Sequence, residues 1–261
     1  MTSVKTPQDI ASMRVGGKKL GSILQELLLM STVGVSLLDL EKHARRRIRE
    51  VGGQSSFTTV EGYPYITCLC INEEVVHGMP RDYTLVDGDV LTIDIGMIYQ
   101  GFHTDTAWTK IVTSQKSQGK SQKDEEKRRF LQAGECALVH AIETAIAGHR
   151  IGDISHAIQQ TIEVSGYHVV ADLTGHGVGK VLHEDPMIPE YVRGNITRTP
   201  LLVAGMTLAI EVIYAMGQGS IIYKSNDGWT LASKDRSLTA TFEHTILVRG
   251  EKSDVLTKAE I

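Results

Sequence analysis

Apolar residues recur every three to four positions in several stretches of the chain, which is typical of amphipathic helices. Polar caps and glycines mark where these helices begin and end. The predicted helices run from an N-cap at Thr6 to a region ended by Gly34, from Ser36 to Gly52–Gly53, over about Asp124–Ala147, and from an N-cap at Asp153 to Ser165. The polar, lysine-rich stretch 113–129 predicts a mobile, solvent-facing loop that runs into the third helix.

Other stretches are continuously apolar and rich in β-branched residues, which is typical of buried strands. They cover 66–71, 90–98, 102–112, 167–171, 206–216 and 238–248. The segment Tyr99–Gly101 separates the second stretch from the third and predicts a hairpin turn. Helices combined with antiparallel strands indicate an α+β fold.

The composition is that of an ordinary globular protein. Of the 261 residues, 41% are hydrophobic and 22% are charged, and the net charge is −4. This charge argues against a general nucleic-acid binder, so we expect no DNA partner. No stretch has the run of about 18 apolar residues that a membrane span needs, and 1–7 lacks the apolar region of a secretion signal. The three cysteines have neither disulfide-framework nor zinc-site spacing, and we therefore expect a cytoplasmic protein that does not bind membranes.

An arginine-rich run, Arg45–Arg47 with Arg49, lies on the second predicted helix. A solvated helix face on which these arginines pair with Glu41 and Glu50 explains the run without any partner. Contact with an RNA surface is the alternative.

Acidic residues interrupt four of the apolar strands. Asp94 and Asp105 stand on the two arms of the predicted hairpin, about opposite each other on one face. Glu211 and Glu243 lie among apolar neighbours in two later strands. Burial of carboxylates without partners costs several kcal/mol, and neither arm of the hairpin supplies a suitable lysine or arginine. Metal ions between the carboxylates would neutralise them.

The glycine-flanked His176 adds an imidazole to these acids. The glycines of Gly175–Gly179 let the backbone approach a bound group closely, although such a stretch can also be an ordinary turn. Four carboxylates and His176 make five donors, enough to hold two divalent cations. Oxygen-rich ligation favours manganese, iron(II), cobalt or zinc. Because water bound between two such ions ionises near neutral pH, hydrolysis is the natural reaction.

Two short patterns occur twice along the chain. They are H-x-x-P at His77–Pro80 and His183–Pro186, and G-x-x-L-x-I followed by an acid at Gly88–Asp94 and Gly205–Glu211. A duplicated unit that buries acids on a strand predicts one domain of two pseudo-symmetric halves, roughly 1–120 and 121–261, with the site between them.

Several motifs follow one another along nearly the whole chain. They are Asn72-Glu73-x-Val75-Val76-His77-Gly78-x-Pro80, Asp94-Ile95-Gly96, Asp105-Thr106-Ala107, Gly175–Gly179 continuing through His183-Glu184-x-Pro186, Ala209-Ile210-Glu211, and Lys234–Ser237 continuing through Phe242–Thr245. Together they resemble the type I methionine aminopeptidases, which are pita-bread metallopeptidases. The resemblance implies duplicated halves whose antiparallel sheet and flanking helices surround a central dinuclear metal site. It also implies removal of the N-terminal methionine from nascent proteins, by hydrolysis with a hydroxide that bridges the metals.

The resemblance gives each candidate site residue a role. It implies that Asp94 chelates one metal, that Asp105 and Glu243 bridge both, and that His176 and Glu211 complete the other metal site, with Glu211 also a proton shuttle. It implies that His77 forms a hydrogen bond towards the nitrogen of the scissile peptide and that His183 forms one to its carbonyl oxygen. The implied wall of the methionine pocket is Tyr63, Cys68 and Trp229. The implied cofactors are two divalent metal ions per chain. The implied partners are N-terminal methionyl peptides, nascent chains and the ribosome, and we expect a monomer.

Departures from the family pattern fall near the pocket. Leu182 stands where phenylalanine is usual, Val60 stands where an aromatic residue is common, and Glu190–Tyr191 replaces a His-Tyr or Asn-Tyr pair. We expect these residues to change the shape of the pocket and the strictness for methionine.

Other functions are compatible with parts of the pattern. A related pita-bread peptidase could have relaxed specificity or act on proline-containing peptides, although prolidases have a two-domain plan and a wider histidine spacing. A non-catalytic pita-bread binding protein would lack a ligand, and all five are present here. A binuclear phosphoesterase would use the same metal pair, so assays of a methionyl peptide and a phosphoester separate these activities.

Overall fold

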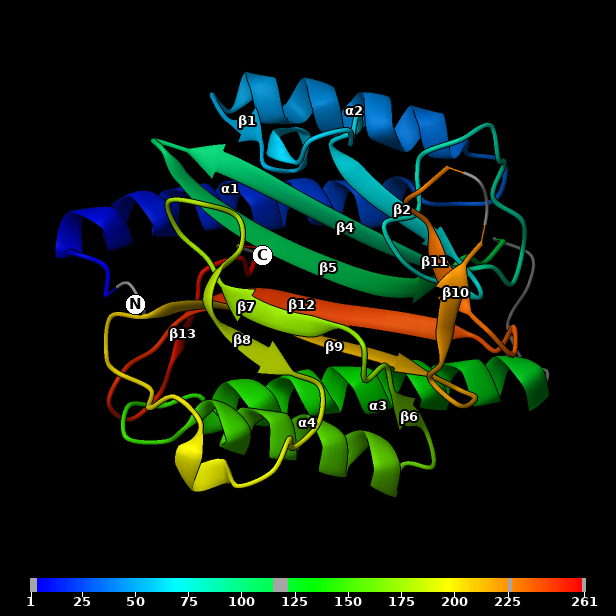
Figure 1. Ribbon diagram of the computed structural model, residues 1–261. Helices are drawn as coiled ribbons and strands as arrows, with labels where there is room; N and C mark the ends of the chain where they lie inside the picture. Colours follow the sequence, from blue (N-terminus) through cyan, green and yellow to red (C-terminus); the bar gives the residue numbers. More distant parts are fainter. Residues whose placement is uncertain (1–3, 115–121, 225–226, 260–261) are drawn as a thin grey trace.

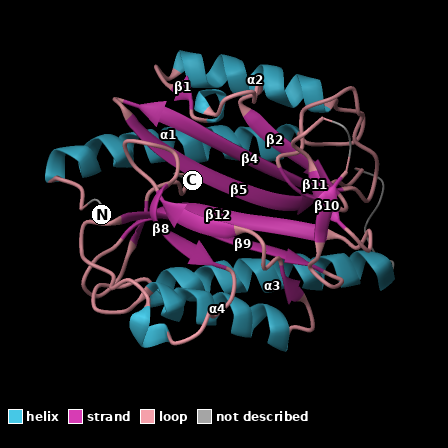
Figure 2. Cartoon of the chain, viewed as in Figure 1, coloured by secondary structure: helices cyan, strands magenta, loops and turns pink. Residues whose placement is uncertain are grey.

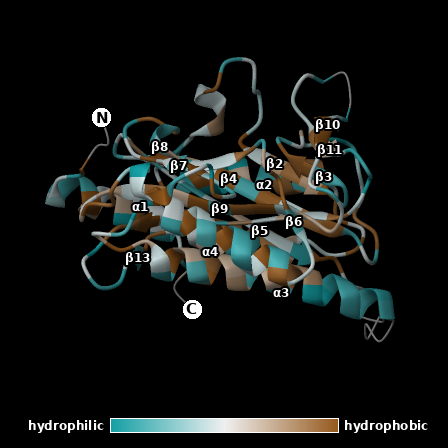
Figure 3. Ribbon diagram, turned by 60° about the horizontal axis from the view of Figure 1, so that its bottom comes forward, coloured by the Kyte–Doolittle hydropathy of each residue, from teal (hydrophilic) through white to brown (hydrophobic). Residues whose placement is uncertain are grey.

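The structure is a computed structural model that describes residues 4–114, 122–224 and 227–259 (Figure 1). A twisted antiparallel sheet forms one layer, and helices pack against one of its faces. Figure 3 shows α1, α3 and α4 on this side of the sheet, while β10 and β11 stand on the other side. The helices are α1 (Pro7–Met30), α2 (Leu37–Glu50), α3 (Gln122–Thr144) and α4 (Ile151–Val164).

The main sheet runs in the order β1-β4-β5-β12-β9-β7-β8, with β2 on β4, β6 on β9 and β13 on β12 (Figure 2). A second, small sheet has the order β10-β11-β3. The strands of the main sheet are β1 (Gln54–Ser55), β2 (Thr67–Ile71), β4 (Val90–Tyr99), β5 (Phe102–Ile111), β6 (His168–Val169), β7 (Thr174–Gly177), β8 (Glu184–Pro189), β9 (Thr207–Ala215), β12 (Thr239–Leu247) and β13 (Asp254–Val255). Those of the small sheet are β3 (Glu74–Val76), β10 (Ile221–Tyr223) and β11 (Leu231–Ser233).

Capping explains where the helices start. Thr6 and Asp9 form a reciprocal capping box at α1, and Ser36 caps α2, as predicted. The prediction of Asp153 as the N-cap of α4 is wrong, because the N-cap is Arg150. Asp153 lies three residues into the helix and accepts a hydrogen bond from the Arg150 backbone nitrogen at 2.7 Å. An acid at this position satisfies an unpaired amide at the helix start just as an N-cap does.

The predicted loop 113–129 is partly wrong. From Gln122 onward the chain is helical as α3, which ends at Thr144 and not at Ala147. Lysine, glutamate and arginine are good helix formers, so a polar, charged sequence does not exclude a helix. Residues 115–121 of the predicted loop lie outside the described part of the chain.

Two apolar cores lie between the helices and the sheet. One joins α1 and α2 to β2 and β4 through side chains such as Leu20, Leu40 and Ile93. The other joins α3 and α4 to β9 and β12 through side chains such as Leu138 and Ile158. Each half of the chain therefore buries its helices against its own strands.

The two halves meet at the centre of the sheet, along a seam between β5 and β12. Backbone pairing here runs through Glu243–Ala107 and His244–Thr106. Threonine hydroxyls add further bonds across the seam, donating from Thr106 to Glu243 O, from Thr109 to Thr241 O and from Thr245 to Asp105 O, each at 2.8 Å. The buried backbone groups are thus satisfied without a continuous ladder of direct bonds.

The arginine run on α2 is largely paired within the protein. Arg45 pairs with Glu41 at 2.6 Å, and Arg46 reaches Glu50 at 3.7 Å. Arg47 pairs with Glu26 at 2.7 Å and also with Glu50. These ion pairs fit the prediction of a solvated helix face that needs no partner.

Across 4–114, 122–224 and 227–259, none of the helices is long and apolar enough to cross a membrane.

Candidate active site

A cavity of about 170 Å³ lies on the face of the sheet opposite one of the cores, because Ile210 and Val212 belong to that core while Glu211 between them lines the cavity. All ten candidate site residues that the sequence indicates lie in its wall. The lining residues are Phe57, Val60, Tyr63, Cys68, Val76, His77, Asp94, Asp105, His176, Leu182, His183, Glu211, Trp229 and Glu243. The structure therefore brings together residues that are up to 186 positions apart, from Phe57 to Glu243.

The four acids enter the cavity from neighbouring strands of the main sheet. Asp94 on β4 pairs with Ala107, and Asp105 on β5 pairs with Gly96, so the two acids share a face but are diagonal neighbours. They were expected to lie about opposite each other; the two-residue turn at Gln100–Gly101 sets the register instead. Glu211 on β9 and Glu243 on β12 are directly opposite each other.

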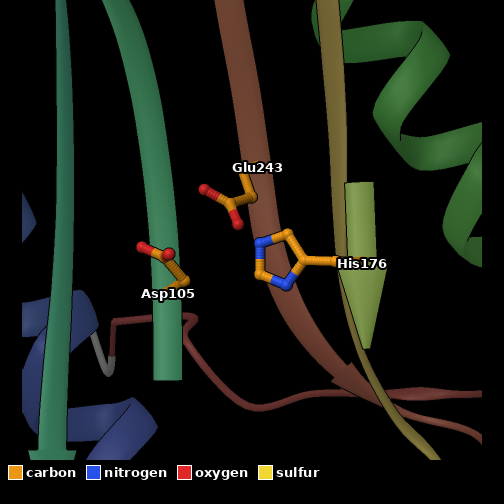
Figure 4. A group of neighbouring side chains, drawn as sticks. All are labelled: Asp105, His176 and Glu243. Carbon is orange, nitrogen blue, oxygen red and sulfur yellow. The ribbon is translucent and has the colours of Figure 1, made fainter. Parts of the chain in front are cut away.

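His176, on β7, lies beside these acids. Side-chain ligand atoms of Asp105, His176 and Glu243 all lie within 4.8 Å of one another (Figure 4). Nε2 of His176 is 3.9 Å from Oε1 of Glu211. The Nδ1–H group of His176 donates to the carbonyl oxygen of Gly177 at 2.8 Å, which leaves Nε2 free of its proton and able to bind a cation.

The acids lack cationic side chains of the protein as partners. In the described residues, none of the ion pairs joins a lysine or arginine to Asp94, Asp105, Glu211 or Glu243. Oδ1 of Asp94 and Oε1 of Glu243 are buried and, among described groups, have no hydrogen-bond partner. Buried, unsatisfied carboxylate oxygens are costly, and divalent cations are the partners that such oxygens prefer.

Burial sets the proton affinities of these groups. It raises the pKa of Asp105 to about 7 and, together with the charge of Asp105, that of Glu211 to about 8. The pKa values of Asp94 and Glu243 lie well above their ordinary range because of burial and then the neighbouring carboxylates. Burial and the nearby His183 lower the pKa of His176 to about 4. His176 is therefore neutral at physiological pH, the state in which imidazole binds metals. The donor set fits divalent cations.

Apolar side chains form the other end of the cavity. Phe57, Tyr63, Cys68 and Leu182 are buried together, with Val60 and Trp229 packed against them. The Tyr63 hydroxyl donates to the carbonyl oxygen of Thr67 at 2.9 Å and lies 3.3 Å from Sγ of Cys68. The rings of Tyr63 and Trp229 meet edge to face at 5.1 Å. These contacts give the cavity an apolar end.

Two histidines stand between the charged and the apolar ends. His77 follows β3 in a left-handed backbone conformation with φ of 57°, and its ring is 6.3 Å from that of Trp229. His183 follows the Gly175–Gly179 stretch, and its ring is 4.5 Å from that of His176. Burial lowers the pKa of both His77 and His183. Both rings are then neutral at pH 7, and each can donate one N–H to a bound group.

Some residues of the site region were not singled out from the sequence. Phe57 and Val76 line the cavity, but Phe57 belongs to a short 3₁₀ helix (Phe57–Thr59) that has no repeating pattern to reveal it. Glu190 is fully buried and accepts a hydrogen bond from the backbone nitrogen of Ile213 at 3.1 Å. Burial and then the charge of Glu211 raise the pKa of Glu190. The sequence marked this residue only as a departure from a family pattern.

Comparisons with known proteins find similar chains. The model of metallopeptidase family M24 matches residues 11–250. The chain is 38% identical to a methionine aminopeptidase of Mycoplasma capricolum, with full coverage of both chains, and 38% identical to methionine aminopeptidase 1 of Bacillus subtilis, with 99% and 100% coverage.

Solved structures give the same result. The methionine aminopeptidase of Thermotoga maritima superposes with a TM-score of 0.91 at 36% identity and covers 99% of this chain and 100% of its own. A prolidase from Pyrococcus furiosus reaches a TM-score of 0.73 at 19% identity, and 66% of that chain is covered. The latter likeness concerns the fold alone.

Proposed function

The chain belongs to the M24 family of metallopeptidases, and on this premise we propose that it is a methionine aminopeptidase, which removes methionine from the amino terminus of peptides and nascent proteins. The predicted α+β pita-bread fold is confirmed by the family match and by the solved relatives. One observation carries the activity: a single cavity holds a five-donor polar cluster at one end and an apolar pocket at the other. Full-length relatives that are named methionine aminopeptidases support it.

We propose that the polar cluster binds two divalent cations. Asp94 would hold one ion, Asp105 and Glu243 would serve both, and His176 and Glu211 would complete the ligand set. The unsatisfied oxygens of Asp94 and Glu243 and the unprotonated Nε2 of His176 support this arrangement. Cobalt, manganese, iron(II) and zinc all suit these donors. Such ions supply Lewis acidity and lower the pKa of a coordinated water.

The remaining residues bind and orient the substrate. The methionine side chain lies among Tyr63, Cys68 and Trp229, which exclude water from it. The neutral ring of His183 donates a hydrogen bond to the carbonyl oxygen of the scissile peptide, where negative charge develops during hydrolysis, and the ring of His77 forms a hydrogen bond with the peptide N–H. Glu211 transfers a proton towards the departing amine.

We infer that the chain is one catalytic domain of two repeated halves, 1–120 and 121–261. Support comes from the two cores, since each half packs a pair of helices on its own strands. A monomer, a cytoplasmic location and an encounter with substrate at the ribosome belong to the same proposal. The free thiols of Cys68 and Cys70, which lie buried without a disulfide, are compatible with a reducing compartment.

Metal-reconstituted assays test the proposed function. The purified chain is stripped of metal, loaded separately with Mn²⁺, Fe²⁺, Co²⁺ or Zn²⁺, and given Met-Ala-Ser, an Xaa-Pro dipeptide and a phosphoester. We expect release of methionine from the tripeptide with at least one metal, little action on the other two substrates, and two metal ions per chain by elemental analysis. Cleavage of the Xaa-Pro dipeptide or the phosphoester in preference to the tripeptide would overturn the proposal.

A further inference from the structure

The loop that carries His183 is held by hydrogen bonds to Glu184, the residue after His183. Glu184, the first residue of β8, directs its carboxylate back towards the loop. Oε1 of Glu184 accepts hydrogen bonds from the backbone nitrogens of Lys180 at 2.6 Å and Val181 at 3.4 Å. Because Leu182 and His183 lie between these amides and Glu184, the carboxylate fixes the path of the chain on both sides of His183.

The other carboxylate oxygen of Glu184 forms an ion pair with Lys5 of the amino-terminal segment. Nζ of Lys5 is 2.7 Å from Oε2 of Glu184, and the side chains are only 2% and 13% exposed. The backbone nitrogen of Lys5 donates to Gly205 O at 2.9 Å, and Val4 bridges to Met206, just before β9. Lys5 thus connects the start of the strand that carries Glu211 to the loop that carries His183.

Gly179 makes room for this ion pair. A Cβ atom at position 179 would lie 2.6 Å from Nζ of Lys5 and 2.8 Å from Oε1 of Glu184, both too close for real atoms. The backbone of Gly179 is not in the left-handed region, so its conformation does not by itself require glycine. A side chain at position 179 would therefore displace the side chain of Lys5 or of Glu184.

We propose that Lys5 is a positioning residue for His183 in the aminopeptidase reaction. It does not line the cavity, but its ammonium group holds the Glu184 carboxylate, and this carboxylate holds the loop. The His183 ring is thereby kept against that of His176, facing the substrate carbonyl. The proposal rests on the proposed function, since it concerns the step that His183 assists. A misplacement of about 1 Å at such a group can cost about 10²-fold in rate.

The test compares Lys5→Met with Lys5→Arg and with a control, Arg14→Met. Methionine keeps the apolar stem of lysine and removes its charge. We expect Lys5→Met to lower kcat by roughly tenfold or more on Met-Ala-Ser while KM stays within about twofold and metal content is unchanged, because the methionine pocket and the metal ligands are untouched. Lys5→Arg should recover part of the lost kcat. Arg14→Met removes the more exposed ion pair with Asp254, at 2.6 Å, and should leave kcat unchanged.

A double variant separates positioning from general stabilisation. If Lys5 acts through His183, Lys5→Met should cost little further activity in a His183→Ala background. If Lys5→Met does not fold, as judged by circular dichroism, Glu184→Gln replaces it, since it removes the ion pair but keeps an oxygen for the loop amides. An unchanged kcat in the folded variant, or full additivity with His183→Ala, overturns this inference alone. Failure of the unmodified chain to cleave the tripeptide with any metal overturns the proposed function and the inference with it.

Discussion

The two ends of the cavity are built in different ways. The acids of the charged end stand on β4, β5, β9 and β12, where strand register fixes their positions. Apart from Cys68 on β2, the apolar end is formed by irregular segments: Phe57 lies in a 3₁₀ helix, and Leu182 and Trp229 lie in loops. Strand register fixes the positions of the acids at the charged end, whereas the loops at the apolar end tolerate changes in the shape of the pocket. We therefore expect substitutions at the charged end to abolish activity and those at the apolar end to alter selectivity.

The largest effect is expected from Asp105→Ala at the charged end. This carboxylate is a proposed metal ligand that lies beside both His176 and Glu243, so its loss should lower kcat by roughly 10³-fold or more. Asp105→Asn, which keeps the shape but not the charge, should be similarly impaired. Circular dichroism, kinetics and metal content check the result. Full activity with unchanged metal content would show that Asp105 is not a ligand.

A smaller loss is expected from His183→Ala, at the boundary between the two ends. Removal of a hydrogen-bond donor to the developing charge should lower kcat by roughly 10²-fold, while two metal ions per chain are retained. Steady-state kinetics and elemental analysis of the same preparation measure both quantities. Loss of one metal equivalent would instead make His183 a ligand and move it to the charged end.

Metal removal should make stability depend on pH. Asp105 has its pKa raised from 3.8 to about 7, and Glu211 from 4.5 to about 8. A carboxyl group whose pKa is raised on folding contributes stability that is fully present below its unfolded value and is lost as the pH rises through its folded value. The lowered pKa of His176 opposes this effect below about pH 6.5, so the Tm of the metal-free protein should fall between about pH 6.5 and pH 8.

Two comparisons sharpen this prediction. Asp105→Asn should flatten the fall in Tm, because one of the raised groups is gone. Saturating metal should raise Tm most at the upper end of this pH range, where the carboxylates are ionised and repel one another. Thermal unfolding at fixed ionic strength measures both. A metal-free Tm that rises between about pH 6.5 and pH 8 would contradict the prediction.

The smallest effect is expected at the apolar end. Leu182 is shorter than phenylalanine, so the unmodified pocket should prefer methionine over leucine or norleucine by a modest margin, and Leu182→Phe should increase that margin. One methylene in an apolar pocket discriminates by about 1–3 kcal/mol. Values of kcat/KM for methionyl, leucyl and norleucyl tripeptides, each with alanine second, measure the change. Identical ratios in both proteins would mean that Leu182 does not touch the substrate.

The same difference explains how much of the site could be predicted from the sequence. Asp94, Asp105, Glu211 and Glu243 stand out because charged residues within apolar strands need partners, and this physical argument requires no relative. Tyr63, Cys68 and Trp229 came from the family resemblance, since nothing in their local sequence marks them as neighbours. Phe57 was missed for the same reason.

Contacts between distant segments set the remaining limit. Lys5 and Glu184 are 179 residues apart, and an isolated lysine before a helix is ordinarily exposed. Helix boundaries were recovered where one cap dominates, as at Thr6, and missed at Arg150, where a residue within the first turn caps the helix. Local sequence patterns thus predict the helices, the strands and the four buried acids, whereas contacts between loops depend on the tertiary fold.

The seam between β5 and β12 joins the two halves through few direct backbone pairs. β4 and β5 pair along their whole length from Val90–Ile111 to Tyr99–Phe102, whereas rotatable threonine hydroxyls supply much of the bonding across the seam. Separation along this seam would leave each half with its own helices and core. It would pull Asp94 and Asp105 away from His176, Glu211 and Glu243. The reactive groups of the site thus face each other across the line along which the two halves are joined.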